Sequence, residues 1–388
     1  MTVLDRLDAD LRLPAEEQLL LDSVCTVAAR EIAPRAADYD RTHTFPQASI
    51  DAINTLGLNA MFIPEAYGGA PLSYRCYLAC VREIAKACAS TGIIWATNFH
   101  AMKPLIEFGS EEQRRRLLPR VAEGALASLA ITEPGAGSDA TGMTTRFEPK
   151  GDRIIVDGTK TFITNGDVAD LYLLFGKWHG VEDPRRAISV LVIEKGTPGL
   201  KVLRVEDKLG TRASGTAALQ FDHCEVPRAN LIGEPGQGLA ILLASLNLSR
   251  PSVAAHALGI ARAAFEDAVG YINERRQSGR RVIEFQGIQF LLADLAAELV
   301  LAENWLWTVG RRIDEGATEF GIEASILKLR ASDLAMRMTT EAVQMLGGYG
   351  YCTDYRVERL MRDAKITQIW EGTNQIHRQL IGRSFMMK

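Results

Sequence analysis

The stretch Thr132-Glu133-Pro134-Gly135-Ala136-Gly137-Ser138-Asp139 directly follows a short apolar run, residues 126–131, with the composition of a β-strand. Its small residues allow the backbone to approach a ligand closely, and its free N–H and hydroxyl groups suit phosphate or ring heteroatoms. An ordinary glycine-rich loop would have the same composition. The spacing differs from the dinucleotide-binding pattern GxGxxG and no βαβ unit follows, so nothing here indicates NAD.

This stretch lies near the start of a region of β character that extends from about residue 125 to residue 232. Glycines, prolines and short β-rich runs multiply there, with turn signals such as Lys150-Gly151-Asp152 between the runs. We expect strands at residues 126–131, 144–149, 153–156, 171–175, 188–193 and 218–221. The region is predicted as a small antiparallel β domain rather than a βαβ unit.

The residues before this region are predicted to form a set of helices. Apolar residues recur at helical spacing from the start, and Pro34 is expected to stop the first helix. Pro46 is suited to open the next helix. Further helices are expected around residues 78–85 and 111–123, the latter with Ser110 as its N-cap.

The residues after the β region return to long helices. We expect them at residues 236–278 (one or two helices), 286–315, 323–346 and 364–387, an arrangement typical of a four-helix bundle. The chain is therefore predicted as α+β in three domains. These are an N-terminal helical domain over residues 1–124, a central antiparallel β domain over 125–232 and a C-terminal four-helix bundle over 233–388.

Composition restricts the class of protein. The 388 residues carry a net charge of −4, so nothing points to nucleic acid. The six cysteines form no CxxC or Cys/His pattern, which favours a reducing compartment and gives no metal site. The first residues resemble neither a signal nor a transit peptide, and no run of about 18 apolar residues is expected to span a membrane. A cytoplasmic location follows as the expectation.

Three further motifs each allow a functional and a structural interpretation. Phe162, flanked by hydroxyls at a strand end, suits stacking on a planar ring, or is simply a core residue. Gly347 and Gly348 expose backbone to a ligand, or only end a helix. Glu371 lies beside Trp370, where desolvation would make its carboxylate a stronger base; alternatively it caps the last helix.

Taken in order, these motifs resemble the acyl-CoA dehydrogenase family, and the resemblance extends from about Glu16 to Ser384. Its most specific segments are Thr132 to Asp139, Lys208-Leu209-Gly210 with Arg212-Ala213-Ser214, Tyr271 to Gln286, and Glu341 to Gln375. The family fold consists of a helical domain, a β domain and a four-helix bundle. The resemblance also implies a homotetramer, with FAD held between domains and at a subunit interface.

The resemblance assigns residues to three parts of a site. The flavin-contacting loop and strand would contain Leu129, Ile131, Thr132, Gly137, Ser138, Phe162, Ile163 and Thr164. Other FAD contacts, in part to the FAD of a neighbouring subunit, would come from Arg275, Gln277, Gln286, Gln344, Gly347, Gly348, Thr373 and Gln375. The acyl-CoA channel would be lined by Ser138, Asn247, Arg250, Trp370 and Gly372.

The reaction that the resemblance implies is α,β-dehydrogenation of an acyl-CoA thioester to the trans-2-enoyl-CoA. Glu371 would remove the α-proton while the β-hydrogen leaves as hydride to flavin N5. The backbone N–H of the glutamate and a ribityl hydroxyl would stabilise the thioester oxygen. An electron-transfer flavoprotein would accept the electrons.

The sequence departs from the family pattern at a few positions. Ser278 and Leu129 replace residues that are often aromatic, Phe162 replaces a frequent Trp, and Trp370 a frequent Tyr. The late position of Glu371 differs from isovaleryl-type members, and no arginine of the glutaryl type follows residue 92. The chain resembles short-chain members most.

Several alternatives stay open. Trp95 or Phe99 would floor a short acyl pocket, or serve only in core packing. The same fold also occurs in acyl-CoA oxidases, in enzymes acting on a carrier-bound acyl group, and in enoyl-CoA reductases. An alternative from another class is a flavin-poor binding paralogue without catalysis.

Overall fold

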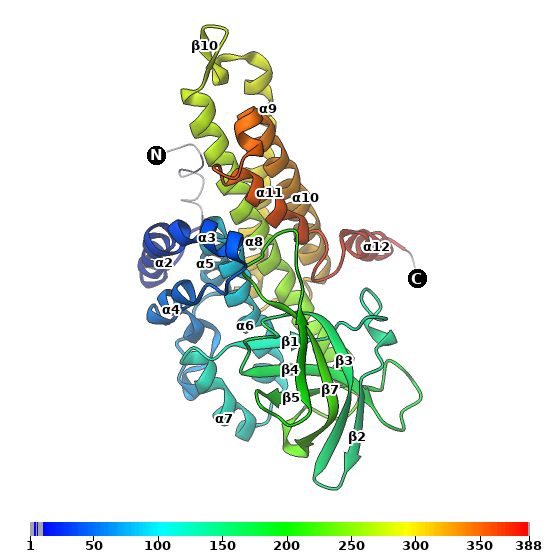
Figure 1. Cartoon of the computed structure of the whole chain (residues 1–388). Coiled ribbons are helices and arrows are strands. Elements are labelled where there is room, and N and C mark those ends of the chain that lie inside the picture. The colour runs from blue at the N-terminus through cyan, green and yellow to red at the C-terminus, as the bar shows by residue number, and fades with distance from the viewer. Residues whose placement is uncertain (1–3, 5, 7–10, 387–388) are drawn as a thin grey trace.

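The computed structural model describes residues 4, 6 and 11–386, and it divides along the chain into helices, a sheet and helices again (Figure 1). This order confirms the predicted fold class. The first part contains α2 (Ala15–Val27), α3 (Ala36–Thr42), α4 (Gln47–Thr55), α5 (Tyr74–Ala87), α6 (Ala89–Phe108) and α7 (Glu111–Ala122), with short 3-10 turns at Leu58–Phe62 and Glu65–Tyr67.

Helix boundaries in this part follow the predicted signals with one exception. Pro46 precedes the first turn of α4, and Ser110 forms a capping box with Gln113 at the start of α7. The expected stop at Pro34 is wrong, because the chain continues through a π-helical segment (Ala28–Ile32) and a 3-10 turn (Ala33–Arg35) into α3. Pro34 lies in the first turn of that 3-10 segment, where the missing N–H costs little.

The central sheet has eight strands in the order β6-β7-β3-β2-β4-β5-β8, with β1 paired to β4. The strands are β1 (Ala127–Ala130), β2 (Arg146–Lys150), β3 (Arg153–Thr164), β4 (Leu171–Trp178), β5 (Ile188–Glu194), β6 (Leu200–Val205), β7 (Thr216–Pro227) and β8 (Leu231–Ile232). Most pairs are antiparallel, but β1 and β2 both run parallel to β4. The sequence analysis missed β6 and β8 and placed the end of β3 too early.

The C-terminal part is built on three long helices, α8 (Gly238–Glu274), α9 (Gln286–Asp314) and α10 (Gly321–Leu346). A small hairpin of β9 (Arg276–Gln277) and β10 (Arg280–Arg281) and a 3-10 turn (Val282–Glu284) join α8 to α9. After a 3-10 segment (Gly347–Tyr351), the chain ends with α11 (Val357–Ile366) and α12 (Asn374–Ser384). The segment expected over 364–387 is therefore the end of α11, a loop and α12; Met387 lies outside the described residues.

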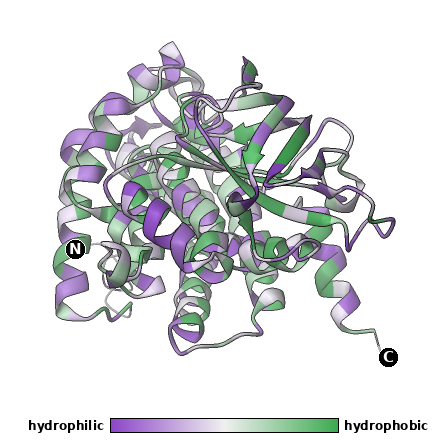
Figure 2. Ribbon diagram, turned by 90° about the horizontal axis from the view of Figure 1, so that it is seen from below, coloured by the Kyte–Doolittle hydropathy of each residue, from purple (hydrophilic) through white to green (hydrophobic). Residues whose placement is uncertain are grey.

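Three hydrophobic clusters hold these parts together. The largest joins α5 and α6 to α8, α9 and α10, so the two helical regions share one core. The second packs α6 and α7 against one face of the sheet, and the third fills the opposite face. Figure 2 shows the hydrophobic residues gathered along the inner strands and the inward sides of the helices. Helix α6 contacts both α8 and β1, so it connects the sheet to the bundle.

Helix α8 bears on the expectation that no segment of the chain spans a membrane. Judged by length and composition alone, α8 is long and apolar enough to cross a bilayer, and it is the single such helix among the described residues. However, 61% of its most apolar window is buried inside the protein, as in the core helix of a folded domain. Its apolar surface is therefore used in packing against its neighbours.

Candidate functional site

The loop between α11 and α12 presents Glu371 in an uncommon backbone conformation. Glu371 has φ 53° and Gly372 has φ 93°, so two consecutive residues are left-handed. Oε2 of Glu371 accepts a hydrogen bond of 2.6 Å from Ser249 Oγ, and Ser249 is buried in α8. The carboxylate is thus only half exposed, and it is held at a defined place against α8.

Polar groups of α10 and α8 surround this loop. Lys328 Nζ donates to the Gly372 carbonyl at 2.7 Å and to Asn374 Oδ1 at 3.1 Å. Burial lowers the pKa of Lys328 to about 7, while the charge of Glu371 opposes that decrease. Burial also lowers the pKa of Arg250, again opposed by Glu371. Glu371 therefore lies within electrostatic reach of two buried cations.

Three buried histidines lie near the loop and are neutral. Burial lowers the pKa of His256 to about 4, and burial with the charges of Lys328 and Arg250 lowers that of His377 to about 3. Burial lowers the pKa of His100 as well, although the charge of Glu371 acts in the opposite direction. Glu371 is therefore the carboxylate that this loop presents next to neutral imidazoles, and it is the candidate proton acceptor.

Trp370 fixes the other side of the loop. Its ring packs edge-to-face against His256, with the two centroids 5.4 Å apart at 65°. Its Nε1, like Nε of Arg250 and Nε2 of His100, is buried without a hydrogen-bond partner. Buried polar atoms normally find partners. A group of such atoms around one carboxylate therefore indicates a place for a polar ligand.

An aromatic cluster closes the space next to these residues. Phe99 packs against Tyr77 with centroids 4.4 Å apart, and Trp95 lies 5.4 Å from the same tyrosine. Tyr77 Oη shares a hydrogen bond of 2.9 Å with Ser252 on α8, and the charge of Glu371 contributes to raising the pKa of Tyr77, after burial. The cluster is thus close to Glu371, and the rings are almost fully buried.

The loop at residues 132–139 is organised by Glu133. Its carboxylate accepts hydrogen bonds from the backbone and side chains of Thr144 and Thr145 and from Lys160 Nζ at 2.8 Å. Burial alone would raise the pKa of Glu133, but Lys160 and the threonines lower it to about 2. Thr161 N donates to Thr132 O at 2.9 Å. These contacts fix the loop against the end of β3.

Phe162 is the unusual residue at that end of β3. Its side chain is 63% exposed although Thr161 and Ile163 beside it are buried, and its φ is 57°. A Cβ added to Gly137, in the adjacent loop, would meet no atom within 4 Å. The structure therefore brings an exposed aromatic ring and an accessible glycine backbone to one region. The side chain of Ile163 itself belongs to the core of the sheet.

The predicted FAD contacts of the C-terminal part form a second group at the far end of α8. Arg275 ends this helix, and its guanidinium lies 5.7 Å from the ring centroid of Tyr349. The 26 residues from Ser249 to Arg275, at about 1.5 Å each, separate the two groups by about 39 Å. One FAD molecule is too short to span that distance. The group consists of Arg275, Gln277, Gln286, Gln344, Gly347 and Gly348, and all six are exposed.

Ser278 explains one departure from the family pattern. It and Gly279 form the two-residue turn between β9 and β10, with φ of 50° and 79°. Two left-handed residues are what a type I′ hairpin turn needs. A small polar residue suits this position better than a bulky one.

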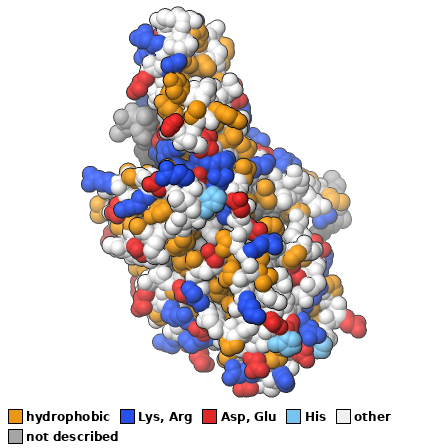
Figure 3. Space-filling model, viewed as in Figure 1, with side chains coloured by type: hydrophobic (Ala, Val, Ile, Leu, Met, Phe, Trp, Pro, Cys, Tyr) orange, Lys and Arg blue, Asp and Glu red, His pale blue; other side chains and the backbone are white. Residues whose placement is uncertain are grey.

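Near this second group lies a large cleft of about 1280 Å³, lined by residues of α3, α8 and α11. Its walls carry Arg41, Arg356, Arg359 and Arg362 together with acidic residues such as Asp40. Figure 3 shows basic side chains gathered across the waist of the molecule, where α3 and α11 lie. Because Arg362 is paired with Asp40 at 2.7 Å, much of this charge is neutralised.

The remaining predicted residues have more local roles. Asn247 Oδ1 accepts from Arg250 Nη1 at 3.0 Å, and Thr373 Oγ1 caps α12 by accepting from Ile376 N at 3.4 Å. Gln375 is exposed, as is Ser138. Leu129 packs on the core between α6, α7 and the sheet.

The sequence analysis missed Ser249 and Lys328 as neighbours of Glu371 and its loop. Ser249 lies between Asn247 and Arg250, both of which were predicted to line the acyl-CoA channel, and this was an available signal. For Lys328 the signal was a cation within the apolar stripe of α10, between residues that are themselves buried.

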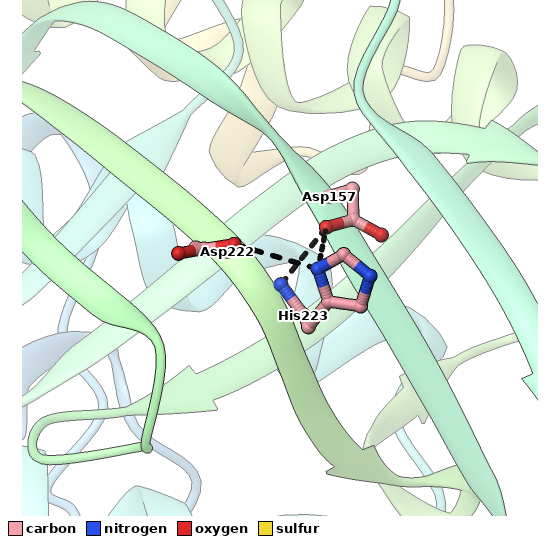
Figure 4. A group of neighbouring side chains, drawn as sticks. All are labelled: Asp157, Asp222 and His223. Atoms are coloured by element: carbon pink, nitrogen blue, oxygen red, sulfur yellow. Dashed lines mark hydrogen bonds and ion pairs between the residues drawn. The ribbon is translucent and has the colours of Figure 1, made fainter.

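A surface group of Asp157, Asp222 and His223 has a spacing that metal ligands can adopt (Figure 4). His223 Nδ1 lies 3.1 Å from Asp157 Oδ1 and 3.4 Å from Asp222 Oδ1. The group lies where the β3–β7 ladder shifts register, so it is a feature of a strand irregularity. It is separate from the loop of Glu371.

Comparison with known proteins places the chain among oxidoreductases that act on CH–CH bonds. Models of three domains match nearly the whole chain: acyl-CoA dehydrogenase N-terminal domain (14–125), middle domain (128–224) and C-terminal domain (236–386). The chain belongs to the acyl-CoA dehydrogenase family, as its sequence motifs predicted.

Individual relatives agree with this assignment. The chain is 41% identical to a probable acyl-CoA dehydrogenase, FadE25, of Mycobacterium tuberculosis, over 97% of this chain and 96% of the relative. It is 39% identical to the pig mitochondrial short-chain specific acyl-CoA dehydrogenase, over 96% and 90%. The solved butyryl-CoA dehydrogenase of Megasphaera elsdenii superposes with a TM-score of 0.94 at 37% identity, over 97% and 99%.

Members of this family are generally flavoproteins that use FAD, and the residues of this chain fit that cofactor. An aromatic ring exposed over most of its surface at Phe162 suits stacking on a planar ring. The buried Asn165 Oδ1 and Asp167 Oδ1 that follow it have no hydrogen-bond partner. Accessible glycine backbone at residue 137 suits close approach.

Proposed function

We propose that this protein converts a short acyl-CoA to its trans-2-enoyl-CoA, with Glu371 as the base that takes the α-proton. The observation that carries the proposal is the hydrogen bond of 2.6 Å from Ser249 to the Glu371 carboxylate, beside buried imidazoles that are neutral. A single carboxylate held in place among buried polar groups suits proton abstraction from a weak carbon acid.

The loop would supply the groups that act on the thioester. The carboxylate of Glu371 takes the proton from Cα as a double bond forms between Cα and Cβ. The backbone N–H of Glu371 donates to the thioester oxygen, where negative charge develops. Bound FAD would accept the β-hydrogen as a hydride. Phe162, Thr132 and Thr164 would hold its ring, and Arg250, Trp370 and Gly372 would line the thioester channel.

A short acyl group suits the aromatic cluster. Phe99, Tyr77 and Trp95 fill the space close to Glu371 with rings 4.4 to 5.4 Å apart. A long acyl chain would have to displace these buried rings. The likeness to a short-chain specific enzyme and to a butyryl-CoA dehydrogenase supports the same substrate class.

The second group of predicted contacts supports assembly into a homotetramer. Because about 39 Å of α8 separates Arg275 from Ser249, Arg275 and its neighbours would serve the FAD of another subunit. An arginine suits the pyrophosphate of that cofactor. An electron-transfer flavoprotein is the proposed electron acceptor, and the cytoplasm the proposed location.

Anaerobic titration of the purified yellow protein with acyl-CoAs tests this function. Butyryl-CoA should bleach the flavin band, and dodecanoyl-CoA should do so more slowly. Glu371→Gln should keep its FAD and lose the bleaching. Rapid bleaching of Glu371→Gln would show that another group is the base, and a clear preference for dodecanoyl-CoA would exclude the short pocket.

The same experiment separates the alternatives. A carrier-protein thioester that bleaches faster than the CoA thioester would identify a carrier-linked substrate. Rapid reoxidation by crotonyl-CoA with slow bleaching by butyryl-CoA would identify an enoyl-CoA reductase. A colourless protein that cannot be reconstituted with FAD would identify a binding paralogue.

A further inference from the structure

Lys328 is a buried cation whose hydrogen bonds are directed at the loop that carries Glu371. The whole residue is 0% exposed, in the middle of α10. Nζ donates to the Gly372 carbonyl at 2.7 Å and to Asn374 Oδ1 at 3.1 Å. An ammonium loses favourable hydration when it is buried, so such a residue is retained only where its contacts compensate.

The backbone that Lys328 holds is strained. Glu371 and Gly372 have φ of 53° and 93°, and the left-handed conformation is unfavourable for a residue with a side chain. A Cβ added to Gly372 would lie 3.2 Å from Nε2 of His377, so the side chain of His377 also confines the loop. The loop keeps this conformation only if its surroundings impose it.

Helix α10 holds the loop at points on both sides of Glu371. Asn374 Nδ2 donates to Ser332 Oγ at 2.9 Å and to Asp333 Oδ1 at 2.7 Å, and Gln368 Nε2 donates to the same carboxylate oxygen at 2.7 Å. Lys328 supplies the point closest to the base, at the carbonyl of the next residue. The Glu371 side chain itself bonds to α8 through Ser249.

The charges that face Lys328 come from every neighbouring element. Glu371 lies in the loop, Arg250 on α8, Asp333 on α10 itself, and His377, neutral through burial, on α12. Attraction between the ammonium and the Glu371 carboxylate is weakly screened because Lys328 is fully buried.

We propose that Lys328 is the positioning residue of the base: it fixes the left-handed backbone at Glu371–Gly372 through the Gly372 carbonyl, and it places a cation near the Glu371 carboxylate. Lys328 acts through Glu371 and not on the substrate. The inference rests on the proposed function, in which Glu371 is the base.

Lys328→Met, which keeps the chain length and removes the ammonium, tests this role. At saturating butyryl-CoA the rate of flavin bleaching at pH 7 should fall on the order of 100-fold, because the base is displaced. The dissociation constant of butyryl-CoA should change little. The ascending limb of the pH–rate profile should move to higher pH, since the carboxylate loses a neighbouring cation. Lys201→Met, at an exposed lysine of β6, should match the wild type.

Lys328→Gln separates the hydrogen bond from the charge. It retains a donor for the Gly372 carbonyl, so it should recover part of the rate while keeping the shifted pH profile. The proposal is overturned if Lys328→Met and Lys328→Gln both fold, contain FAD and show the bleaching rate and pH–rate profile of the wild type. Loss of the fold in both variants would also overturn it, because Lys328 would then be a residue of general stability. Normal bleaching of Glu371→Gln would instead refute the proposed function.

Discussion

Ser249 of α8 and Glu371 of the α11–α12 loop are 122 residues apart in sequence, yet Ser249 Oγ lies 2.6 Å from the Glu371 carboxylate. The hydroxyl donates to an oxygen of the carboxylate, and hydrogen bonds to an ionised acceptor are stronger than those between neutral groups. The contact therefore orients the carboxylate against α8.

Ser249→Ala should slow flavin bleaching by butyryl-CoA at pH 7. A hydrogen bond to a charged group contributes about 1.5–3 kcal/mol, which corresponds to roughly tenfold or more in rate. The ascending limb of the pH–rate profile should move to higher pH, and part of the lost rate should return there. Stopped-flow measurements between pH 6 and 9 test this expectation. The matched control is Ser49→Ala, because Ser49 is a buried serine of α4 whose hydroxyl has no hydrogen-bond partner.

Phe162→Ala should weaken FAD binding without destabilising the apoprotein. The ring is 63% exposed and its residue has φ 57°, so its removal uncovers little core. Loss of aromatic stacking costs about 1–3 kcal/mol, or roughly 10- to 100-fold in FAD dissociation constant. Flavin absorbance after dialysis and thermal unfolding of the apoprotein measure the two effects. An unchanged FAD content would contradict a stacking role, and Leu19→Ala, also at an exposed apolar residue, should retain FAD.

Glu133→Gln should lower stability and remove one source of its pH dependence. The pKa of Glu133 is about 2 in the folded protein against an ordinary value of 4.5. A lowered pKa stabilises the fold above the ordinary value, and this contribution is lost as the pH falls toward 2. The variant leaves Lys160 buried without its counterion, at a cost of about 3 kcal/mol at pH 7. Urea unfolding at pH 7 and pH 3 should show a difference between the proteins that shrinks at pH 3.

Phe99→Leu should shift the substrate preference toward longer acyl chains. Phe99 packs 4.4 Å from Tyr77 in the cluster next to the base, so a smaller side chain opens space there. We expect the ratio of kcat/KM for octanoyl-CoA to that for butyryl-CoA to rise about tenfold, the effect of roughly one methylene group. Phe175→Leu, at a phenylalanine buried in the sheet, should destabilise the protein without changing that ratio. Equal ratios in both variants would show that Phe99 does not limit the pocket.

The sequence predicted the order of helices, sheet and helices because hydrophobic periodicity is a local property. It failed where the local pattern was weak. Strand β6 lies at the edge of the sheet with nearly all residues exposed, so Leu200–Val205 shows no alternation of buried and exposed positions. Strand β3 continues past Gly158 through two register shifts, which interrupt the strand pattern.

The candidate site was predictable only in part. Glu371 and Phe162 were found because their neighbours in sequence formed motifs. Lys328 and Ser249 reach the loop from positions 44 and 122 residues away from their partners. No local rule connects such positions, since the contact arises only when α8 and α10 pack together. The family resemblance gave the role of Glu371, but not the residues that hold it.

The length of α8 has a consequence for how the protein retains its cofactor. Ser249 within α8 and Arg275 at its C-terminal end, about 39 Å apart, would serve the sites of two different subunits in the proposed assembly. Loss of a subunit then removes part of the binding site of its neighbour. By linkage, FAD should strengthen subunit association by the same factor by which association strengthens FAD binding. Dilution alone should therefore release FAD from the protein as the subunits separate, and added FAD should restore both bound flavin and oligomer.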